Sequence, residues 1–320
     1  MMSRLKRIIA SAWSLAAGAG WDHDRLDPSQ APAVRLEPLG PWYYDLGRSI
    51  ARGDYRNFDG QGIPRRQAQG ALVYDPSLVA SFSLAHMTSY LLKGGAGDRA
   101  KALAAARWLV EHQVAEGEGP LAGAMPFTHS LGGVAAPFAS ALTQGQAMSA
   151  LGRAWLLVRE EAFARAAVAA LRPLERGLEE GGVRARFHGS TSVWYEEFPF
   201  AEDPTHVLNG FVFALWGLRD VSLLGLAPKA EALYRAGLAS LATHLPAFDS
   251  GYWSYYQCPD RARPRVASLS YHHFHCVMLR ILSELESDNV FAQTADRWEA
   301  YLGRRRCRLR ALAAKLGDWR

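Results

Sequence analysis

Four apolar helix starts recur at nearly even intervals along this chain, and the recurrence limits the fold more than any other feature. They fall near residues 76, 140, 203 and 270, about 64, 63 and 67 residues apart. Each start opens an apolar helix, and a more charged helix follows it. A repeated unit of two helices is typical of stacked helical hairpins. The pattern predicts a mainly α chain that forms an (α/α) toroid, an incomplete barrel of about four helical hairpins.

The toroid is expected over residues 73–320, behind an N-terminal extension of residues 1–72. Asp75-Pro76 and Asp203-Pro204 are helix starts, because Asp suits the N-cap and Pro the first helical position. Asp98 is the expected cap of the second helix. Eight predicted helices cover or begin at about 75–92, 98–116, 140, 160–179, 203, 228–244, 270 and 288–303.

The N-terminal extension has the composition of extended structure. Residues 21–72 are rich in Pro, Gly, Asp and Arg, and they predict one or two short hairpins packed on the helices. The basic start and the apolar run from Ile8 to Gly20 resemble a signal peptide. This run is too short to span a bilayer, so no stable membrane span is expected and a short amphipathic helix or a frayed end is favoured.

Net charge and cysteine content indicate which partners the protein binds and in which cellular compartment it folds. A net charge of +5 over 320 residues favours anionic partners, and no nucleic acid partner is expected. Cys258, Cys276 and Cys307 have no metal-ligand spacing and form no obvious disulfide framework, which favours a reducing compartment. A cytoplasmic bacterial protein is the favoured interpretation. An exported or membrane-associated protein is the alternative, and a homodimer is compatible with either.

The stretch from Trp194 to Phe211 places Glu196 and Glu197 between aromatic residues, just before a helix that is apolar nearly all round. Such a helix is buried on every side. An acidic, aromatic loop at the mouth of a buried helix suits a ring-shaped ligand. The alternative is a loop whose carboxylates only favour the positive end of the helix. Because neighbouring side chains in an extended loop point in opposite directions, only one of the two glutamates can face a cleft.

The loops before the inner helices of a toroid converge on one face, so the spacing predicts a single cleft there. Tyr74, Gln144, the two glutamates and Tyr271 lie in or next to these loops. The aromatic run from Asp249 to Tyr256 alternates, which predicts a strand or hairpin arm, with an aromatic lid as the alternative.

Three histidines occur in Tyr271-His272-His273-Phe274-His275. A zinc-binding helix places His at positions i and i+4 and adds a third ligand. Here His272 and His275 are three positions apart and nothing completes the set, so no metal is expected. Instead, Tyr271 and His275 should share one helix face and point into the ring.

Six motifs stand in one order along the chain: Gln144-Gly145-Gln146-Ala147-Met148-Ser149, Trp194-Tyr195-Glu196-Glu197-Phe198-Pro199, Val207-Leu208-Asn209-Gly210-Phe211, Leu245-Pro246-Ala247-Phe248-Asp249-Ser250-Gly251, Tyr271-His272-x-x-His275 and Arg297-Trp298-x-x-Tyr301-Leu302. Together they resemble the C-terminal catalytic region of D-glucuronyl C5-epimerases, which convert glucuronate to iduronate in heparan-type chains. The resemblance is strongest over residues 138–303. It implies a helical (α/α) domain, in agreement with the helix spacing.

The resemblance also implies residue roles. Glu197 is implied as a catalytic acid or base, Tyr271 as its counterpart on the other face of the sugar, and Tyr256 as a third catalytic residue. Together with the converging loops and the available hydrogen-bond donors, the resemblance predicts these substrate-binding residues: Tyr74, Gln144, Gln146, Tyr195, Glu196, Asn209, Arg261, Arg263, Arg265 and His275. No metal and no cofactor are implied, and the implied partner is an anionic polysaccharide.

The chain departs from the family pattern in three ways. Phe198 stands where the family usually has Tyr, so any proton relay through that hydroxyl is lost or moved. The loop between Tyr256 and Tyr271 is shorter, which leaves Arg261, Arg263 and Arg265 as alternatives for holding the substrate carboxylate. The animal enzymes carry a membrane anchor and a β-rich region ahead of the helices, where this chain has about seventy residues.

These features predict C5-epimerisation of D-glucuronate to L-iduronate in a heparosan- or heparan-like polysaccharide. The reaction removes the proton beside the sugar carboxylate and returns one from the opposite face, while hydrogen-bond donors or cations stabilise the carbanion. A uronate-polysaccharide lyase shares the first step and is the first alternative. A glycan-binding toroid without turnover is the second.

Overall fold

The computed structural model describes residues 24–27, 29–258 and 265–317. The chain divides into two compact units, which are described separately. The first unit contains the described parts of residues 1–25, 207–209 and 241–320, and the second contains residues 26–206 and 210–240. The boundary predicted after residue 72 follows a different criterion, the change from extended to helical sequence, and stays a prediction.

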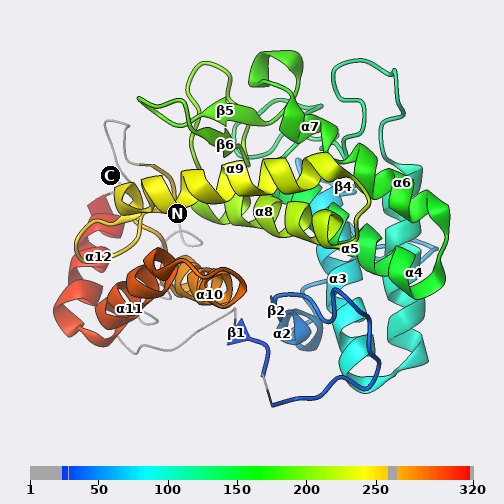
Figure 1. The fold of residues 1–320 in the computed structure, drawn as a ribbon, viewed down its shortest axis with the longest axis horizontal. Coiled ribbons are helices and arrows are strands. Elements are labelled where there is room, and N and C mark those ends of the chain that lie inside the picture. Colours follow the sequence, from blue (N-terminus) through cyan, green and yellow to red (C-terminus); the bar gives the residue numbers. More distant parts are fainter. Residues whose placement is uncertain (1–23, 28, 259–264, 318–320) are drawn as a thin grey trace. The chain divides into compact units, whose positions relative to one another are not determined.

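The second unit holds two complete helical hairpins and most of a third. In the first two hairpins, α3 (Pro76–Lys93) packs on α4 (Ala96–Glu111) and α5 (Ala141–Val158) packs on α6 (Glu161–Ala169). The third consists of α8 (Leu208–Leu223) and α9 (Pro228–His244) (Figure 1), where Gly237 of α9 packs against Leu215 and Phe211 of α8. The predicted fold class, a mainly α chain of (α/α) hairpins, is confirmed.

The remaining elements of the second unit are short. They are β2 (Tyr44–Asp45), α2 (Gly47–Ala51), β3 (Arg66–Ala68), β4 (Ala71–Val73), α7 (Arg172–Glu175), η1 (Leu178–Glu180), β5 (Arg184–Arg186) and β6 (Val193–Tyr195). β3 and β4 form an antiparallel hairpin just before α3, as predicted for the N-terminal extension. The long predicted helix at 160–179 is wrong, because the chain leaves the helical path after Ala169 and again after Glu175.

The first unit contains the fourth hairpin, α10 (Leu269–Leu285) and α11 (Asn289–Gly303). It also contains β1 (Asp24–Arg25), η2 (Leu245–Phe248) and α12 (Arg305–Gly317). α12 is a further helix beyond the eight predicted, and it begins with an arginine-rich run. No helix in the described part of the chain is both long and apolar enough to cross a membrane. The predicted signal-like segment at residues 1–20 lies outside the described residues.

The helix-start predictions are confirmed at three of the four inner helices. Asp75 caps α3 as predicted, since its carboxylate accepts the backbone N–H groups of Ser77 and Leu78 at 2.9 and 3.1 Å. The prediction for Asp98 is wrong. Gly95 is the N-cap of α4, and the Asp98 carboxylate instead bonds His86 and Ser89 on the neighbouring α3.

The third predicted start, at Asp203, is also wrong, because α8 begins at Leu208. The cause is His206, which has a left-handed backbone with φ of 51°. A helix cannot pass through a residue in this conformation, so α8 begins only beyond it.

The inner helices of the second unit pack closely because glycines face one another. A Cβ added at Gly145 of α5 would fall on the backbone carbonyl of Phe213 in α8, and one at Gly217 of α8 would meet the backbone of Gly145. α5 also packs on α3. The consecutive inner helices α3, α5 and α8 are therefore neighbours, which fixes where the loops before them lie.

Gly145→Ala should destabilise the second unit, because the new methyl group meets backbone that cannot rotate away. We expect a loss of unfolding free energy of about 1–3 kcal/mol. Gly97→Ala is the matched control. Gly97 is exposed in the first turn of α4 with no atom within 4 Å of an added Cβ, so this change should be neutral or stabilise by up to about 1 kcal/mol. Denaturant unfolding of both variants measures the difference, and equal effects would contradict the close packing of α5 on α8.

Candidate functional site

Glu196 is fully buried in the second unit, and groups of the protein itself form hydrogen bonds with its carboxylate. Its carboxylate accepts the backbone N–H of His206 at 3.0 Å and the Thr205 hydroxyl at 3.4 Å, and it also contacts Nδ1 of His206. The N–H of His188 donates to Nε2 of His206 at 3.3 Å. Because Nε2 accepts, Nδ1 carries the proton in the neutral ring and donates it to Glu196. Glu196 therefore holds the left-handed turn at residue 206 that delays the start of α8.

Glu197 is half-buried and lies where two inner helices begin. A Cβ at Gly210, in the first turn of α8, would lie 2.5 Å from Cβ and Oε2 of Glu197. One residue earlier, the carbonyl of Glu196 accepts the N–H of Ala141 at the start of α5, at 2.9 Å. Of the two adjacent glutamates, Glu197 is thus the partly exposed one.

Gln144 and Gln146 lie in the first turns of α5, near this loop. The Gln144 amide exchanges two hydrogen bonds of 3.4 Å with the backbone of Met125, so it holds the loop before α5. Gln146 is 4% exposed, and its Oε1 has no hydrogen-bond partner among the described residues. Gln146 therefore has an unused acceptor close to the start of the helix, whereas Gln144 has none.

Tyr195 and Tyr74, both predicted to bind substrate, have protein partners for their hydroxyl groups. Tyr195 is fully buried and donates to the carbonyl of Leu233 in α9 at 2.9 Å, and burial raises its pKa. Tyr74 donates to the Asp59 carboxylate at 2.6 Å, and this bond raises the pKa of Tyr74. Their predicted contacts with a substrate stay predictions.

The aromatic loop before α5 packs around Phe198. The cluster of Phe127, Val134 and Phe138 has Phe198 against it. A Cβ at Gly132 would collide with the Phe198 ring, and Gly132 also has a positive φ of 60°. Both the close approach and the backbone conformation therefore favour glycine at this position. Phe198 is thus a packing residue, in keeping with the absence of a hydroxyl there.

His129 in the same loop was missed by the sequence reasoning. It is 6% exposed, and neither ring nitrogen has a hydrogen-bond partner among the described residues. Its ring packs edge-on to Phe127 with centroids 5.5 Å apart. The only signal in the sequence is a lone histidine in a Gly- and Pro-rich loop, which carries no periodicity to mark it as buried.

The first unit brings Tyr256, Tyr271 and His275 together. The rings of Tyr256 and Tyr271 meet edge to face with centroids 4.9 Å apart, and the His275 ring lies 6.4 Å from that of Tyr271. Tyr271 is 39% exposed, whereas His275 is fully buried. The predicted pairing of Tyr271 and His275 on one face of the helix is confirmed.

Backbone hydrogen bonds fix Tyr256 at the end of its hairpin arm. Its N–H donates to the carbonyl of Arg265 at 3.0 Å, and its carbonyl accepts the N–H of Leu208 at 3.2 Å. Asn209, also predicted to bind substrate, follows directly and is 2% exposed. Arg265 is exposed, while Arg261 and Arg263 lie outside the described residues. Of the three candidate arginines, Arg265 is therefore the one whose backbone is tied to Tyr256.

A buried polar chain lies behind Tyr271. Nε2 of His272 donates to the carbonyl of Trp298 at 3.1 Å, so its Nδ1 accepts from the N–H of Ser254 at 3.0 Å. The Ser254 hydroxyl lies 2.9 Å from Nδ1 of His275, whose Nε2 has no partner among the described residues. No group of three or more His, Cys, Asp or Glu side chains with the geometry of a metal site occurs in the described part of the chain.

His275 should make the stability of the protein pH-dependent. Burial lowers its pKa to about 3, below the 6.5 of an exposed histidine. Between these values the unfolded chain binds a proton that the folded chain does not, so stability falls as the pH falls from about 6.5 toward 3. The slope from one such proton is about 1.4 kcal/mol per pH unit.

Denaturant unfolding from pH 7 to pH 4 tests this expectation. His275→Gln removes the titrating group and should give a shallower loss of unfolding free energy, even if the variant is less stable at pH 7. His272 stays in both proteins, and its pKa is lowered mainly by burial, which the variant keeps. Identical slopes would show that His275 is not held neutral.

The comparisons with known proteins identify the family of the chain. Residues 122–300, more than half of the chain, match the family described as the D-glucuronyl C5-epimerase C-terminus, and the chain belongs to that family. The resemblance seen in the sequence is thereby confirmed. Glu197, Tyr256, Tyr271 and His275 all lie within the matched residues.

The relatives share about half of this chain. It is 36% identical over 177 residues to a D-glucuronyl C5-epimerase of Caenorhabditis elegans, covering 51% of this chain and 28% of that protein. It is 29% identical over 160 residues to an uncharacterised protein of Methanocaldococcus jannaschii, covering 49% of this chain and 50% of that protein. The chain thus spans half or less of the length of these relatives.

Among solved structures, the unsaturated glucuronyl hydrolase of Bacillus sp. GL1 matches with a TM-score of 0.47 and 18% identity. The match covers 70% of this chain and 61% of that one.

Proposed function

We propose that this protein inverts C5 of D-glucuronate residues within a polysaccharide, giving L-iduronate in a heparosan- or heparan-like chain. The observation that carries the proposal is the family match over residues 122–300, which contains all three proposed catalytic residues. The C. elegans relative, which is a D-glucuronyl C5-epimerase by name, supports the same reaction. The proposed catalytic residues are Glu197, Tyr256 and Tyr271.

The chemistry explains why such residues are needed. The C5 proton lies beside a carboxylate, and its removal leaves a carbanion whose charge the carboxylate takes up. Donors that hold this carboxylate stabilise the transition state more than the ground state. We assign this role to Asn209, Gln146 and an arginine of the 261–265 segment.

Proton transfer then requires two groups. One removes the proton from one face of the sugar and the other supplies a proton to the opposite face, and each contributes about 10²–10⁴-fold. Glu197 is a half-buried residue, and Tyr271 is 39% exposed. We assign the two transfers to these residues, with Tyr256 supporting Tyr271 through the ring contact. The reaction written this way needs no cofactor.

Proton NMR of uronate polymers incubated with the protein in D₂O tests the proposal. Epimerisation predicts deuterium at C5 together with new iduronate signals. An unsaturated uronate absorbing in the ultraviolet would instead mean a lyase, because the shared carbanion then expels the C4 oxygen. Binding without exchange or new absorbance would mean a glycan-binding protein without turnover.

A further inference from the structure

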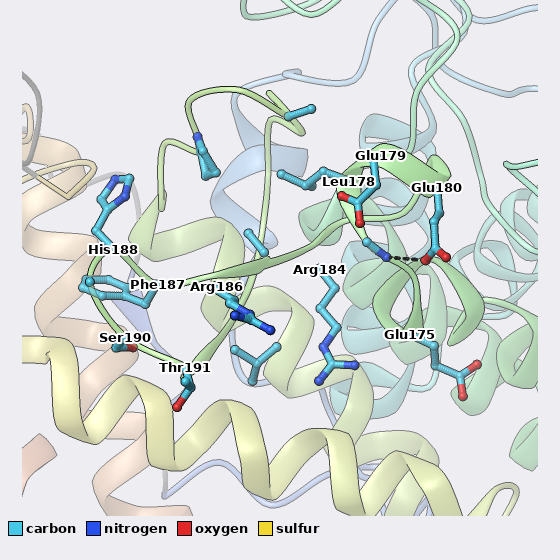
Figure 2. Close-up of a pocket in the computed structure, with 16 residues that line it drawn as sticks. Glu175, Leu178, Glu179, Glu180, Arg184, Arg186, Phe187, His188, Ser190 and Thr191 are labelled. Carbon is cyan, nitrogen blue, oxygen red and sulfur yellow. Dashed lines mark hydrogen bonds between the residues drawn. The ribbon is translucent and has the colours of Figure 1, made fainter.

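The second unit contains a pocket of about 880 Å³ that none of the assigned residues line (Figure 2). Its walls are the segment 175–180, strand β5 and the turn 187–191 that leads to β6. The volume falls within the range of about 300–1,000 Å³ common for small-molecule sites. The pocket is therefore large enough to hold one or more sugar rings.

Two arginines of β5 give this pocket unused positive charge. Arg184 and Arg186 are exposed and two residues apart, so both side chains lie on the same face of the strand. Neither guanidinium has an ion-pair or hydrogen-bond partner within the described residues. Figure 2 shows both side chains in the middle of the lining. A guanidinium presents paired N–H donors that match the two oxygens of a carboxylate.

The acidic side of the pocket is partly satisfied by the protein itself. Glu175 forms an ion pair with Lys229 at 2.8 Å, and the Glu180 carboxylate accepts the N–H of Gly177 at 3.0 Å. Carboxylate oxygens with remaining lone pairs accept from hydroxyl groups. A ligand with both hydroxyls and a carboxylate, as an acidic sugar has, matches this mixed lining better than a simple anion.

A short stretch of chain connects the pocket lining to the loop that carries Glu197. β5 pairs with β6 in antiparallel register, with Arg186 opposite Val193, and Val193 itself lines the pocket. From Val193 to Glu197 is four residues, at most about 14 Å of chain. On the other side, His188 of the lining donates its N–H to His206, which is bonded to Glu196. This short separation lets one polymer chain reach both Glu197 and the pocket.

We propose that the pocket is a subsite for a second acidic sugar of the same polysaccharide chain, with Arg184 and Arg186 contacting its carboxylate. The proposal rests on the proposed function for the polymer that occupies it. The subsite favours polymers whose second acidic sugar reaches the pocket when the first lies at Glu197. It adds affinity and takes no part in proton transfer. Its effect falls on KM for long chains, and kcat is unaffected.

The test compares Arg184→Gln/Arg186→Gln with Arg165→Gln, which removes an exposed arginine of α6 outside the pocket. Calorimetry with an acidic and a neutral oligosaccharide measures binding, and steady-state assays on long and minimal uronate substrates measure KM and kcat. The double variant should lose roughly tenfold in affinity for the acidic chain, as expected for two partly exposed charged contacts. Its KM for the long substrate should rise equally, with kcat unchanged. Arg165→Gln should match the unsubstituted protein.

The outcomes separate the subsite from the proposed function. An active protein whose double variant keeps the original KM and affinity overturns the subsite and leaves the epimerase proposal standing. A protein that binds the acidic chain without C5 exchange, and whose double variant binds it tenfold more weakly, overturns the reaction and supports the subsite. Failure of the unsubstituted protein to bind any acidic oligosaccharide overturns the subsite directly.

Discussion

Glu197→Gln is expected to lower kcat for epimerisation by about 10²–10⁴-fold, the usual contribution of a general acid or base. The amide keeps the size of the side chain and its fit against Gly210 but cannot exchange a proton at C5. Thermal stability should change little, because the residue is only half-buried. The measurement is kcat from iduronate formation by NMR, with a thermal scan of the same preparation.

Glu196→Gln is the matched control one residue away. Its carboxylate is fully buried and accepts from His206 and Thr205, so the neutral amide loses charge-assisted hydrogen bonds. The unfolding free energy should fall by about 1.5–3 kcal/mol. The kcat of the folded protein should fall less than it does in Glu197→Gln. If Glu196→Gln abolishes turnover while Glu197→Gln leaves it near normal, the roles of the two carboxylates are reversed.

The helical framework was predictable from sequence because it depends on local signals. Asp75 caps its helix through its own neighbours Ser77 and Leu78, and the apolar period of each inner helix is continuous. Asp203 carries the same signal, yet α8 starts five residues later. The difference lies in a contact between distant residues, since Glu196 captures the turn at His206. No local rule registers such a contact.

The candidate site was predictable only in part for the same reason. The family resemblance favoured Glu197, but the residues alone left both Glu196 and Glu197 open. The turn at residue 206 shows that Glu196 is used inside the protein. Tyr256 and Tyr271 could be named from motifs, whereas their ring contact depends on the hairpin that joins Tyr256 to Arg265. His129 and the two arginines of β5 lie in segments without helical period or motif.

Tyr271→Phe is expected to lower kcat for epimerisation by about 10²–10⁴-fold while leaving the fold intact. The change removes one hydroxyl and keeps the ring that meets Tyr256 edge to face at 4.9 Å. Tyr271 is 39% exposed, and the phenylalanine ring that replaces it carries no polar atom. The substitution therefore leaves no unpaired polar group on this side chain. The unfolding midpoint should therefore stay close to that of the unsubstituted protein.

Isotope exchange gives the sharper result for this variant. If Glu197 and Tyr271 serve opposite faces of the sugar, removing one leaves the other able to exchange the C5 proton of a single epimer without inverting it. In D₂O, Tyr271→Phe should then place deuterium at C5 of only one polymer, either the glucuronate or the iduronate form. Glu197→Gln should place deuterium at C5 of the other form only. Exchange lost equally from both polymers in both variants would mean that one group performs both transfers. Near-normal epimerisation by both variants would show that these residues are structural and that proton transfer lies elsewhere in the chain.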